Sequence, residues 1–228
     1  MLGAVSILAA LVGRERDPAR ESAGGGQRID ISLLGATLAS LVNQAQNAFV
    51  AGAAPGRLGN AHPNIVPYEA FETADDPIVV AIGSERQWPR FCHAIGLPDL
   101  ATDDRFATNG DRVVNREALR PILTTRFARD GARAWLAALD AASIPCGPIN
   151  DIVTAFGSDE AKALGMTEEQ AHPAWGIIRQ AGIPFQLAAT PASIRTPPPV
   201  LGEHTDEILE GLGFGASEIA ELRRRQVV

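Results

Sequence analysis

The chain has 228 residues, 46% of them hydrophobic, and a formal net charge of -7, which is enough for one large domain or parts of two. Lys162 is the only lysine, so we expect no basic surface of the kind that binds the phosphates of nucleic acids or anionic lipids. Cys92 and Cys146 are too few for a disulfide framework or a cysteine zinc site, which favours a reducing cytoplasm and predicts no metal centre.

Residues 1–12 form an apolar run that is followed by Arg14 and Arg16. No positive residue precedes the run and no small-residue cleavage pattern closes it, so it is not typical of a signal peptide. It is also shorter than the about 20 residues that a bilayer-spanning helix needs. Because no capping residue stands ahead of it, we interpret the run as an interior helix whose beginning lies outside the chain.

Residues 17–26 are predicted to form a polar loop that ends in glycines, and Ser32 is predicted to cap a helix that runs to about Phe49. Glycine and proline then recur at Gly52, Pro55, Gly56 and Gly59. This density of residues with restricted or unusual backbone angles predicts a connecting segment between two bodies.

The next unit begins with residues 77–83, an apolar run of strand length, and Ser84 and Gln87 have the spacing of a capping box for a following helix. Helical patterns cover residues 109–128 and 130–142. Residues 144–148 then break the chain, and Cys146 between two prolines is predicted to lie in a turn. A strand that leads into helices indicates a mixed α/β or α+β body.

Two short helical pieces, residues 152–156 and 160–164, precede a predicted hairpin of residues 175–179 and 183–187 with Gly182 in its turn. Residues 190–199 are rich in proline and predict an extended connector. Thr205 and Ser217 are predicted to cap two amphipathic helices at the end of the chain.

Four segments of the chain resemble the family III CoA-transferases, also called the CaiB/BaiF family. These are residues 26–33, 59–68, 144–150 and 202–209. The resemblance implies an α/β fold class, namely the C-terminal part of a two-domain fold with a remnant of a Rossmann-like large domain and a small α+β domain. It also implies that full-length members form an interlocked dimer.

On this template residues 1–35 are the large-domain remnant, and residues 36–66 are a linker that carries a substrate-proximal loop. The small α+β domain then covers residues 67–172, the second linker covers 173–197, and the helices of residues 198–228 return to the large domain. The family's other CoA contacts lie upstream, so the CoA-binding residues of this chain are not predicted.

The resemblance implies a CoA-transferase that moves CoA from an acyl-CoA donor to a carboxylic acid acceptor through an aspartyl-CoA intermediate. The nucleophilic aspartate is expected before Met1, so the isolated chain is expected to be inactive. Coenzyme A thioester is then a substrate, and no cofactor is bound permanently. The expected partners are acyl-CoA, a carboxylic acid, and either a second copy of the full-length protein or a complementing N-terminal half, with no nucleic acid and no membrane.

Two alternatives stay open at this point. One is an acyl-CoA racemase, which resembles the transferases but works by proton transfer at Cα. The other is a catalytically incomplete fragment or a complementing subunit. Acyl transfer between two acids without exchange at Cα separates the transferase from the racemase.

One segment lies where related transferases carry a glycine-rich loop that covers the site. It consists of Gly59, Asn60, Ala61, His62, Pro63 and Asn64. Gly59 permits positive φ, and Pro63 restricts His62 to an extended backbone, so the amides of Asn60 and Ala61 are expected to be free to face a thioester oxygen. The alternative is a tightly wound crossover between domains in which His62 caps a carbonyl.

Glu85 lies near the position of an active-site glutamate in the related racemases, but helix capping explains this residue equally well. Asp30 is interpreted as a carboxylate that binds nearby backbone, and His204 as a helix-entry residue. His93 and His172 are interpreted as surface or structural residues.

Overall fold

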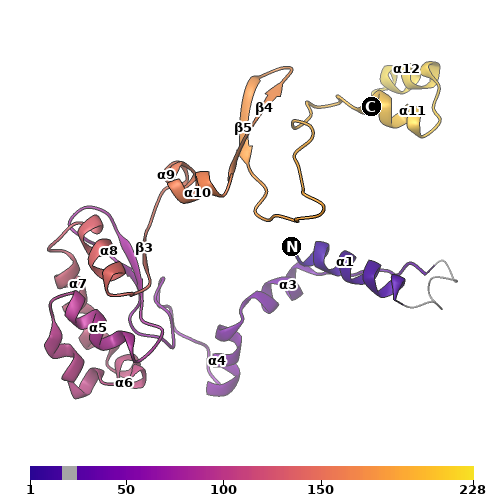
Figure 1. The fold of residues 1–228 in the computed structure, drawn as a ribbon. Coiled ribbons are helices and arrows are strands. Elements are labelled where there is room, and N and C mark those ends of the chain that lie inside the picture. Colours follow the sequence, from indigo (N-terminus) through magenta and orange to yellow (C-terminus); the bar gives the residue numbers. More distant parts are fainter. Residues whose placement is uncertain (17–24) are drawn as a thin grey trace. The chain divides into compact units, whose positions relative to one another are not determined.

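The computed structural model describes residues 1–16 and 25–228 of the chain (Figure 1). They divide into two compact units, Met1–Ile149 and Asn150–Val228, which are described separately. Most of the polar loop predicted at residues 17–26 lies outside the described residues.

The described residues of the first unit open with the helices α1 (Leu2–Glu15), α3 (Leu33–Ser40) and α4 (Asn43–Ala51). The predicted first helix is confirmed. Ser32 caps the next helix as predicted, since its Oγ accepts from Gly35 N at 3.0 Å. A single helix from residue 32 to 49 is wrong, because Val42 adopts a φ of 42° and interrupts it. Positive φ is unusual for a β-branched residue, and no apolar periodicity signals it.

The apolar face of α1 is open to solvent in this chain. Val5 is 60% exposed and Leu8 is 61% exposed, and α1 buries none of its residues. Helices of this composition are stabilised by packing of the apolar face against another element. Among the described residues, no helix has both the length and the apolar composition to cross a membrane.

A three-stranded antiparallel sheet follows, with β2 (Ile78–Ala81) between β1 (Tyr68–Phe71) and β3 (Cys146–Pro148). The strand predicted at residues 77–83 is confirmed. The turn predicted at Cys146 is wrong, since Cys146 pairs with Val80 in the sheet. The flanking prolines remove donors but keep their carbonyls, and Pro145 O accepts from Ala81 N at 3.0 Å. Strand β3, which follows the helix of residues 132–141, therefore pairs with the edge of β2 that β1 leaves free.

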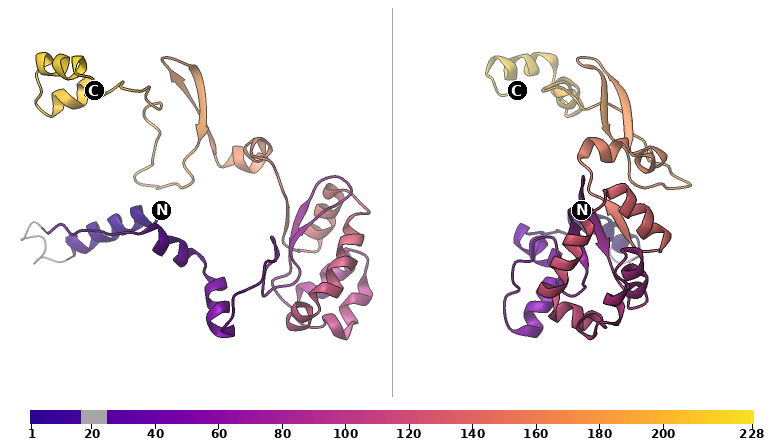
Figure 2. Two further views of the ribbon diagram at one scale, coloured as in Figure 1. Left: turned by 180° about the vertical axis from the view of Figure 1, so that it is seen from behind. Right: turned by 90° about the vertical axis from the view of Figure 1, so that its left-hand side faces the viewer.

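Helices gather beside this sheet, as Figures 1 and 2 show from different sides. They are α5 (Gln87–Ala94), α6 (Asn109–Val114), α7 (Arg116–Phe127) and α8 (Ala132–Ala141), with short 3₁₀ helices at Pro98–Thr102 and Asp104–Phe106. The helix predicted at residues 109–128 is divided at Asn115, whose carboxamide turns back to the carbonyls of Arg105 and Asp111. The helix predicted at residues 130–142 is confirmed.

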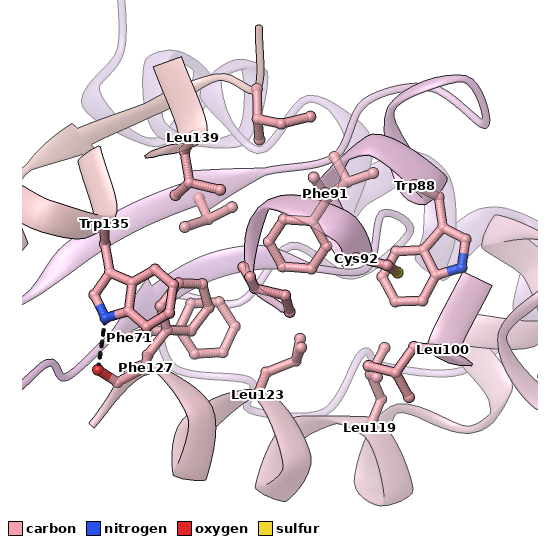
Figure 3. Packing of buried hydrophobic residues seen from close by; sticks show 14 of the residues in the cluster. Phe71, Trp88, Phe91, Cys92, Leu100, Leu119, Leu123, Phe127, Trp135 and Leu139 are labelled. Atoms are coloured by element: carbon pink, nitrogen blue, oxygen red, sulfur yellow. Dashed lines mark hydrogen bonds between the residues drawn. The ribbon is translucent and has the colours of Figure 1, made fainter. Parts of the chain in front are cut away.

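The core of the first unit lies between the sheet and these helices and is built around aromatic rings (Figure 3). The ring centroids of Phe71 in the sheet and Phe127 in α7 are 4.9 Å apart. Phe127 meets Trp135 of α8 edge-on, with ring centroids 5.2 Å apart. The Trp135 indole donates to the Phe127 carbonyl at 2.9 Å, so its polar atom is satisfied inside the core. This core fixes α7 against the sheet.

The second unit starts with α9 (Ile152–Gly157) and α10 (Asp159–Ala163), which confirm two predicted helices. A hairpin of β4 (Thr167–His172) and β5 (Gly176–Ala181) follows. The hairpin predicted at residues 175–179 and 183–187 is wrong, because the partner of β5 is the segment before it and Gly182 donates to Met166 at the open end. Strand β4 has no apolar alternation, so periodicity does not reveal it.

The unit ends with α11 (Thr205–Gly211) and α12 (Ala216–Arg224). The predicted helices are present, but their N-caps are His204 and Gly215 instead of Thr205 and Ser217. Glu218 Oε2 accepts from the Gly215 amide at 2.7 Å, which satisfies a free N–H at the start of α12.

The N-terminus of α8 is capped from a distant turn, and this arrangement requires a glycine. Asp75 Oδ1 accepts from Ala132 N at 2.7 Å, and such backbone bonds hold the pKa of Asp75 below its usual value. A Cβ at Gly131 would lie 2.6 Å from Asp75 Oδ2. The cap and a side chain at position 131 therefore exclude each other.

We expect Gly131→Ala to displace the Asp75 cap and to lower the free energy of unfolding by about 1 kcal/mol, the usual contribution of an N-cap. Urea unfolding measures this. Gly147→Ala is the control, because a Cβ there meets nothing within 4 Å and is expected to have no destabilising effect. Equal effects of the two substitutions would contradict the cap.

Candidate functional site

The segment of residues 59–64, called here the 59–64 loop, is fastened to the outer edge of β1. Gly59 has a φ of 63°, as expected. His62 N donates to Tyr68 O at 2.9 Å, and Asn60 Oδ1 accepts from Ala70 N at 3.2 Å. The loop thereby satisfies the outward-facing backbone groups of an edge strand, which are otherwise unpaired.

The two amides expected to be open differ in the structure. Ala61 N donates to Leu58 O at 3.1 Å, so the expectation is wrong for Ala61. For the Asn60 amide, the part of the chain that is described offers no hydrogen-bond acceptor, and Asn60 is exposed. The Asn60 amide is therefore a free backbone donor of the 59–64 loop, beside the turn at Gly59.

The ring of His62 is held on both sides. It stacks on Tyr68, with ring centroids 5.3 Å apart and an interplanar angle of 4°. Nδ1 accepts from Asn64 N at 3.1 Å, which leaves the proton of the neutral ring on Nε2. Nε2 lies 3.4 Å from Nδ2 of Asn43, and because both nitrogens are donors in this tautomer, this contact is not a hydrogen bond. The ring thus binds an amide and not a backbone carbonyl, in contrast to the capping role expected for the crossover interpretation.

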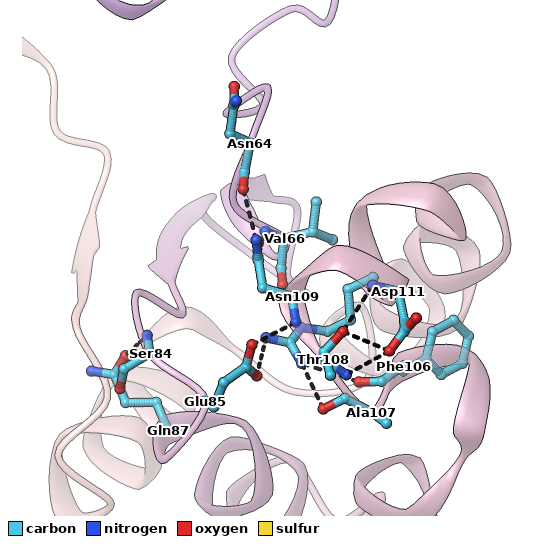
Figure 4. Close-up of polar contacts among 11 residues, drawn as sticks. Asn64, Val66, Ser84, Glu85, Gln87, Phe106, Ala107, Thr108, Asn109 and Asp111 are labelled. Atoms are coloured by element: carbon cyan, nitrogen blue, oxygen red, sulfur yellow. Dashed lines mark hydrogen bonds and ion pairs between the residues drawn. The ribbon is translucent and has the colours of Figure 1, made fainter.

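Helix α4 and helix α6 hold Asn64 from two directions. Asn47 and Asn64 exchange a reciprocal pair of carboxamide bonds of 2.8 and 3.1 Å. The carboxamide of Asn109 donates to Asn64 O at 2.8 Å and accepts from Val66 N at 3.0 Å (Figure 4). The break in the helix at Val42 starts α4 anew, and it is α4 that carries Asn47.

Arg112 of α6 is fully buried below the end of this segment. Its Nε donates to Val66 O at 2.7 Å and its Nη1 to Phe106 O at 3.0 Å. Its guanidinium carbon lies 4.6 Å from the centre of the Trp88 ring. A buried guanidinium is stable only when its donors are satisfied and a negative charge is near.

Glu85 supplies that negative charge (Figure 4). Its Oε2 accepts from Arg112 Nη2 at 3.1 Å and its Oε1 from Asn109 N at 2.7 Å. Both carboxylate oxygens therefore have structural partners, although the side chain is 55% exposed. The helix after Glu85 begins later than expected, at Gln87, and only the Gln87 arm of the capping box forms, with Ser84 N as donor. A catalytic role for Glu85 remains a prediction.

Arg116, the first residue of α7, binds the middle of the 59–64 loop. Its Nη2 donates to the carbonyls of His62 and Pro63 at 2.9 and 2.8 Å. Helix α7 is in turn fixed to the sheet by the aromatic core. The loop is consequently held to the rigid part of the unit by side chains from three helices.

Sequence reasoning found the loop but missed the residues that hold it: Asn47, Asn109, Arg112 and Arg116. The capping box of Thr108 and Asp111 was a readable signal for the start of α6, and hence for a polar residue beside it at position 109. No pattern along the chain indicates that these side chains converge on one segment.

The other candidates lie elsewhere. His172 is 4% exposed and does have partners, since Nε2 lies 2.9 Å from Pro198 O and Nδ1 accepts from Ala174 N. Asp30 pairs with Arg28 in an exposed position. Burial raises the pKa of the Cys92 thiol to about 12, so this thiol is unreactive near neutral pH. Among the described residues, no group of three or more His, Cys, Asp or Glu side chains has the arrangement of a metal site.

Comparison with known proteins identifies the class to which this fold and loop belong. The family model for CoA-transferase family III matches residues 1–205. The succinate–glutarate CoA-transferase of Agrobacterium fabrum is 37% identical over 189 residues, which cover 83% of this chain and 47% of the relative. The succinyl-CoA:glutarate CoA-transferase of Mus musculus is 36% identical over 205 residues, with 90% and 46% covered.

A solved structure agrees with this result. A CAIB/BAIF family protein from Brucella suis superposes with a TM-score of 0.71 at 33% identity, covering 91% of this chain and 52% of that one. The chain belongs to CoA-transferase family III. It spans about half the length of the curated relatives it matches, which confirms the expected partial-domain character. The superposition on a family structure confirms the expected α/β class.

We expect Arg112→Met to lower the free energy of unfolding by roughly 2–4 kcal/mol, because it leaves buried carbonyls without a charged donor. Urea unfolding measures the loss. Arg105→Met is the matched control, since Arg105 also lies over an aromatic ring, Phe106, but is 59% exposed and pairs with Asp103. The control is expected to cost less than about 1 kcal/mol, and a similar cost for both would contradict the role of Arg112.

Proposed function

We propose that this chain provides the loop-bearing part of a CoA-transferase that moves CoA from an acyl-CoA donor to a carboxylic acid acceptor. The observation that carries the proposal is the 59–64 loop itself. Its backbone is fixed at both ends, and its free Asn60 amide is adjacent to a positive-φ glycine. A fixed, water-free N–H is what stabilises the developing negative charge of a thioester oxygen.

In the proposed reaction, a carboxylate supplied from outside the described chain attacks the thioester carbonyl. The products are an acyl-carboxylate anhydride and the CoA thiolate, which then attacks the carboxylate's own carbonyl and releases the donor acid. The acceptor acid repeats these two steps in reverse and leaves as its CoA thioester. Covalent catalysis divides a difficult exchange into easier steps.

The anhydride in this sequence is readily hydrolysed, so the site must exclude water while it exists. We assign this task to the 59–64 loop. The ring of His62 stacked on Tyr68 provides an apolar wall, and the Asn64 contacts keep the loop in one conformation. The aspartate nucleophile is proposed to lie before Met1 or on a complementing polypeptide.

The relatives' names guide the choice of acids. Both relatives quoted above are named for exchange between succinate and glutarate, which supports short dicarboxylic acids as substrates here. The proposal also includes a homodimer of the longer protein, a cytoplasmic location and no permanently bound cofactor. Glu85 is retained as a catalytic candidate only for the racemase alternative.

The test is an acyl-transfer assay with succinyl-CoA and glutarate, followed by mass spectrometry of both thioesters in heavy water. We expect the 228-residue chain alone to be inactive. Mixing it with a polypeptide that supplies the other half of the relatives' length is expected to give glutaryl-CoA without deuterium at Cα.

Three other results would each reject part of the proposal. Deuterium incorporation at Cα without acyl transfer would favour the racemase. Robust turnover by the chain alone would show that the nucleophile lies within it. Absence of turnover in the mixture, with both polypeptides folded, would support a catalytically incomplete fragment.

A further inference from the structure

A buried carboxylate lies beside the arginine that holds the 59–64 loop. Glu69 of β1 is 3% exposed, and its Oε2 is 2.9 Å from Nε of Arg120, which is 57% exposed. Arg116 and Arg120 are four residues apart in α7, so they lie on the same face of the helix. Arg120 forms the ion pair with Glu69, whereas Arg116, one turn away on the same face, binds the loop and acts on Glu69 through its charge.

Two polar atoms of this cluster lack good hydrogen-bond partners. They are Nη1 of Arg116 and Oε2 of Glu69, both buried, and Oε2 lies 2.9 Å from Arg120 Nε in an ion pair. Arg116 Nη2, in contrast, is shared between two loop carbonyls. The guanidinium of Arg116 is thus bonded on its loop side, while its Nη1 is buried and has no hydrogen-bond partner among the described residues.

We propose that Arg116 is a positioning residue that fixes the 59–64 loop over the site, and that the ionised carboxylate of Glu69 keeps Arg116 in place. This rests on the proposed function in that the loop is taken to cover the substrate. It adds that the charge of one buried side chain, Glu69, determines whether the loop stays attached.

The physical reason is the desolvation of Arg116. Two carbonyl dipoles do not replace the water that a guanidinium loses on burial, whereas a nearby negative charge offsets the loss. When Glu69 is neutral, Arg116 gains by turning its head to solvent. The His62 and Pro63 carbonyls then lose their donor, and the loop loses its attachment to α7.

The direction of the pH effect follows from the charges around Glu69. Burial raises the pKa of Glu69 above its usual value, while Arg120 and Arg116 lower it and Glu117 raises it. Since the charge of Arg116 favours ionised Glu69, ionised Glu69 must favour the bound position of Arg116. Loop attachment is therefore present above the pKa of Glu69 and is lost as pH falls through it.

The first experiment compares Arg116→Gln with Arg120→Gln by amide hydrogen exchange in the 228-residue chain. Both variants remove one positive charge beside Glu69 from the same face of α7. We expect Arg116→Gln to lower protection of the His62 and Asn64 amides by roughly 10- to 100-fold, the factor for losing hydrogen bonds to a charged group. At a pH above the pKa of Glu69, where Glu69 stays ionised in both variants, Arg120→Gln is expected to change it less than about threefold, because Arg120 does not touch the loop. Protection of β2 amides is the folding control.

The second experiment uses Glu69→Gln, which keeps the side-chain shape and removes the charge. In the unchanged chain, loop protection relative to the intrinsic exchange rate is expected to fall as pH decreases through the raised pKa of Glu69. In Glu69→Gln it is expected to be low throughout, and the fall with pH is expected to shrink. The urea midpoint is not expected to decrease, because burial makes the ionised form of Glu69 unfavourable in the folded state.

The Glu69→Gln variant also distinguishes the effect of Glu69 from that of other titratable groups near the loop. His62 protonation would remove the Asn64 bond to Nδ1, and Glu85 supports Asn109, so any pH dependence left in Glu69→Gln belongs to these two residues. Equal loop protection in Arg116→Gln and the unchanged chain would overturn the positioning role. Unchanged protection and pH profile in Glu69→Gln would overturn the role of the carboxylate.

The attachment of the loop by Arg116 and Glu69 is called here the latch. The exchange measurements do not require turnover, so they test the latch separately from the proposed activity. If Arg116→Gln loosens the loop but no acyl transfer is found in the reconstituted mixture, the latch stands and the proposed function fails. If transfer occurs and is equally fast in Arg116→Gln and Arg120→Gln at saturating and at low succinyl-CoA, the latch does not act on the site and is rejected.

Discussion

The sheet-and-helix part of the first unit and its 59–64 loop both depend on the contacts of one buried guanidinium, that of Arg112. It joins the end of the loop segment at Val66, the 3₁₀ turn at Phe106 and the carboxylate of Glu85. These three elements are far apart in sequence and share no strand pairing. Since a buried charge is costly unless every donor is used, the geometry of the segment after the loop is dictated by this one side chain.

A hierarchy of attachments follows from this constraint. The aromatic core fixes α7 to the sheet, Arg112 fixes the chain at Val66, and Asn109 and Asn47 then determine the position of Asn64. The loop itself contributes almost no buried apolar surface, so polar contacts carry its conformation. Such segments open at lower free energy than the core below them, which is the property required of a cover that must admit a substrate and then exclude water.

The sequence identified elements wherever apolar period or capping chemistry was strong, and it failed where tertiary contacts decide. The strand at residues 78–81 and the helices of residues 116–127 and 132–141 have clear patterns. Strand β4 is polar on both faces, the break at Val42 adopts a backbone angle its residue type disfavours, and Cys146 joins a sheet edge through the carbonyls of prolines. For the site, glycine and proline marked the loop, but the convergence of Arg112, Arg116 and Asn109 depends on the fold alone.

The chemistry available in the described residues explains why the loop's contribution is conformational. Glu85 uses both carboxylate oxygens to hold backbone and Arg112, and the Cys92 thiol is buried with a pKa of about 12. His62 commits Nδ1 to the Asn64 amide, which makes it a poor general base at that atom. What remains beside Gly59 is a free backbone N–H on a loop that Arg116 binds through two of its carbonyls. A fixed N–H of this kind is suited to stabilising a carbonyl that a carboxylate attacks, and this agrees with the proposed division between a loop that covers the site and a nucleophile supplied from elsewhere.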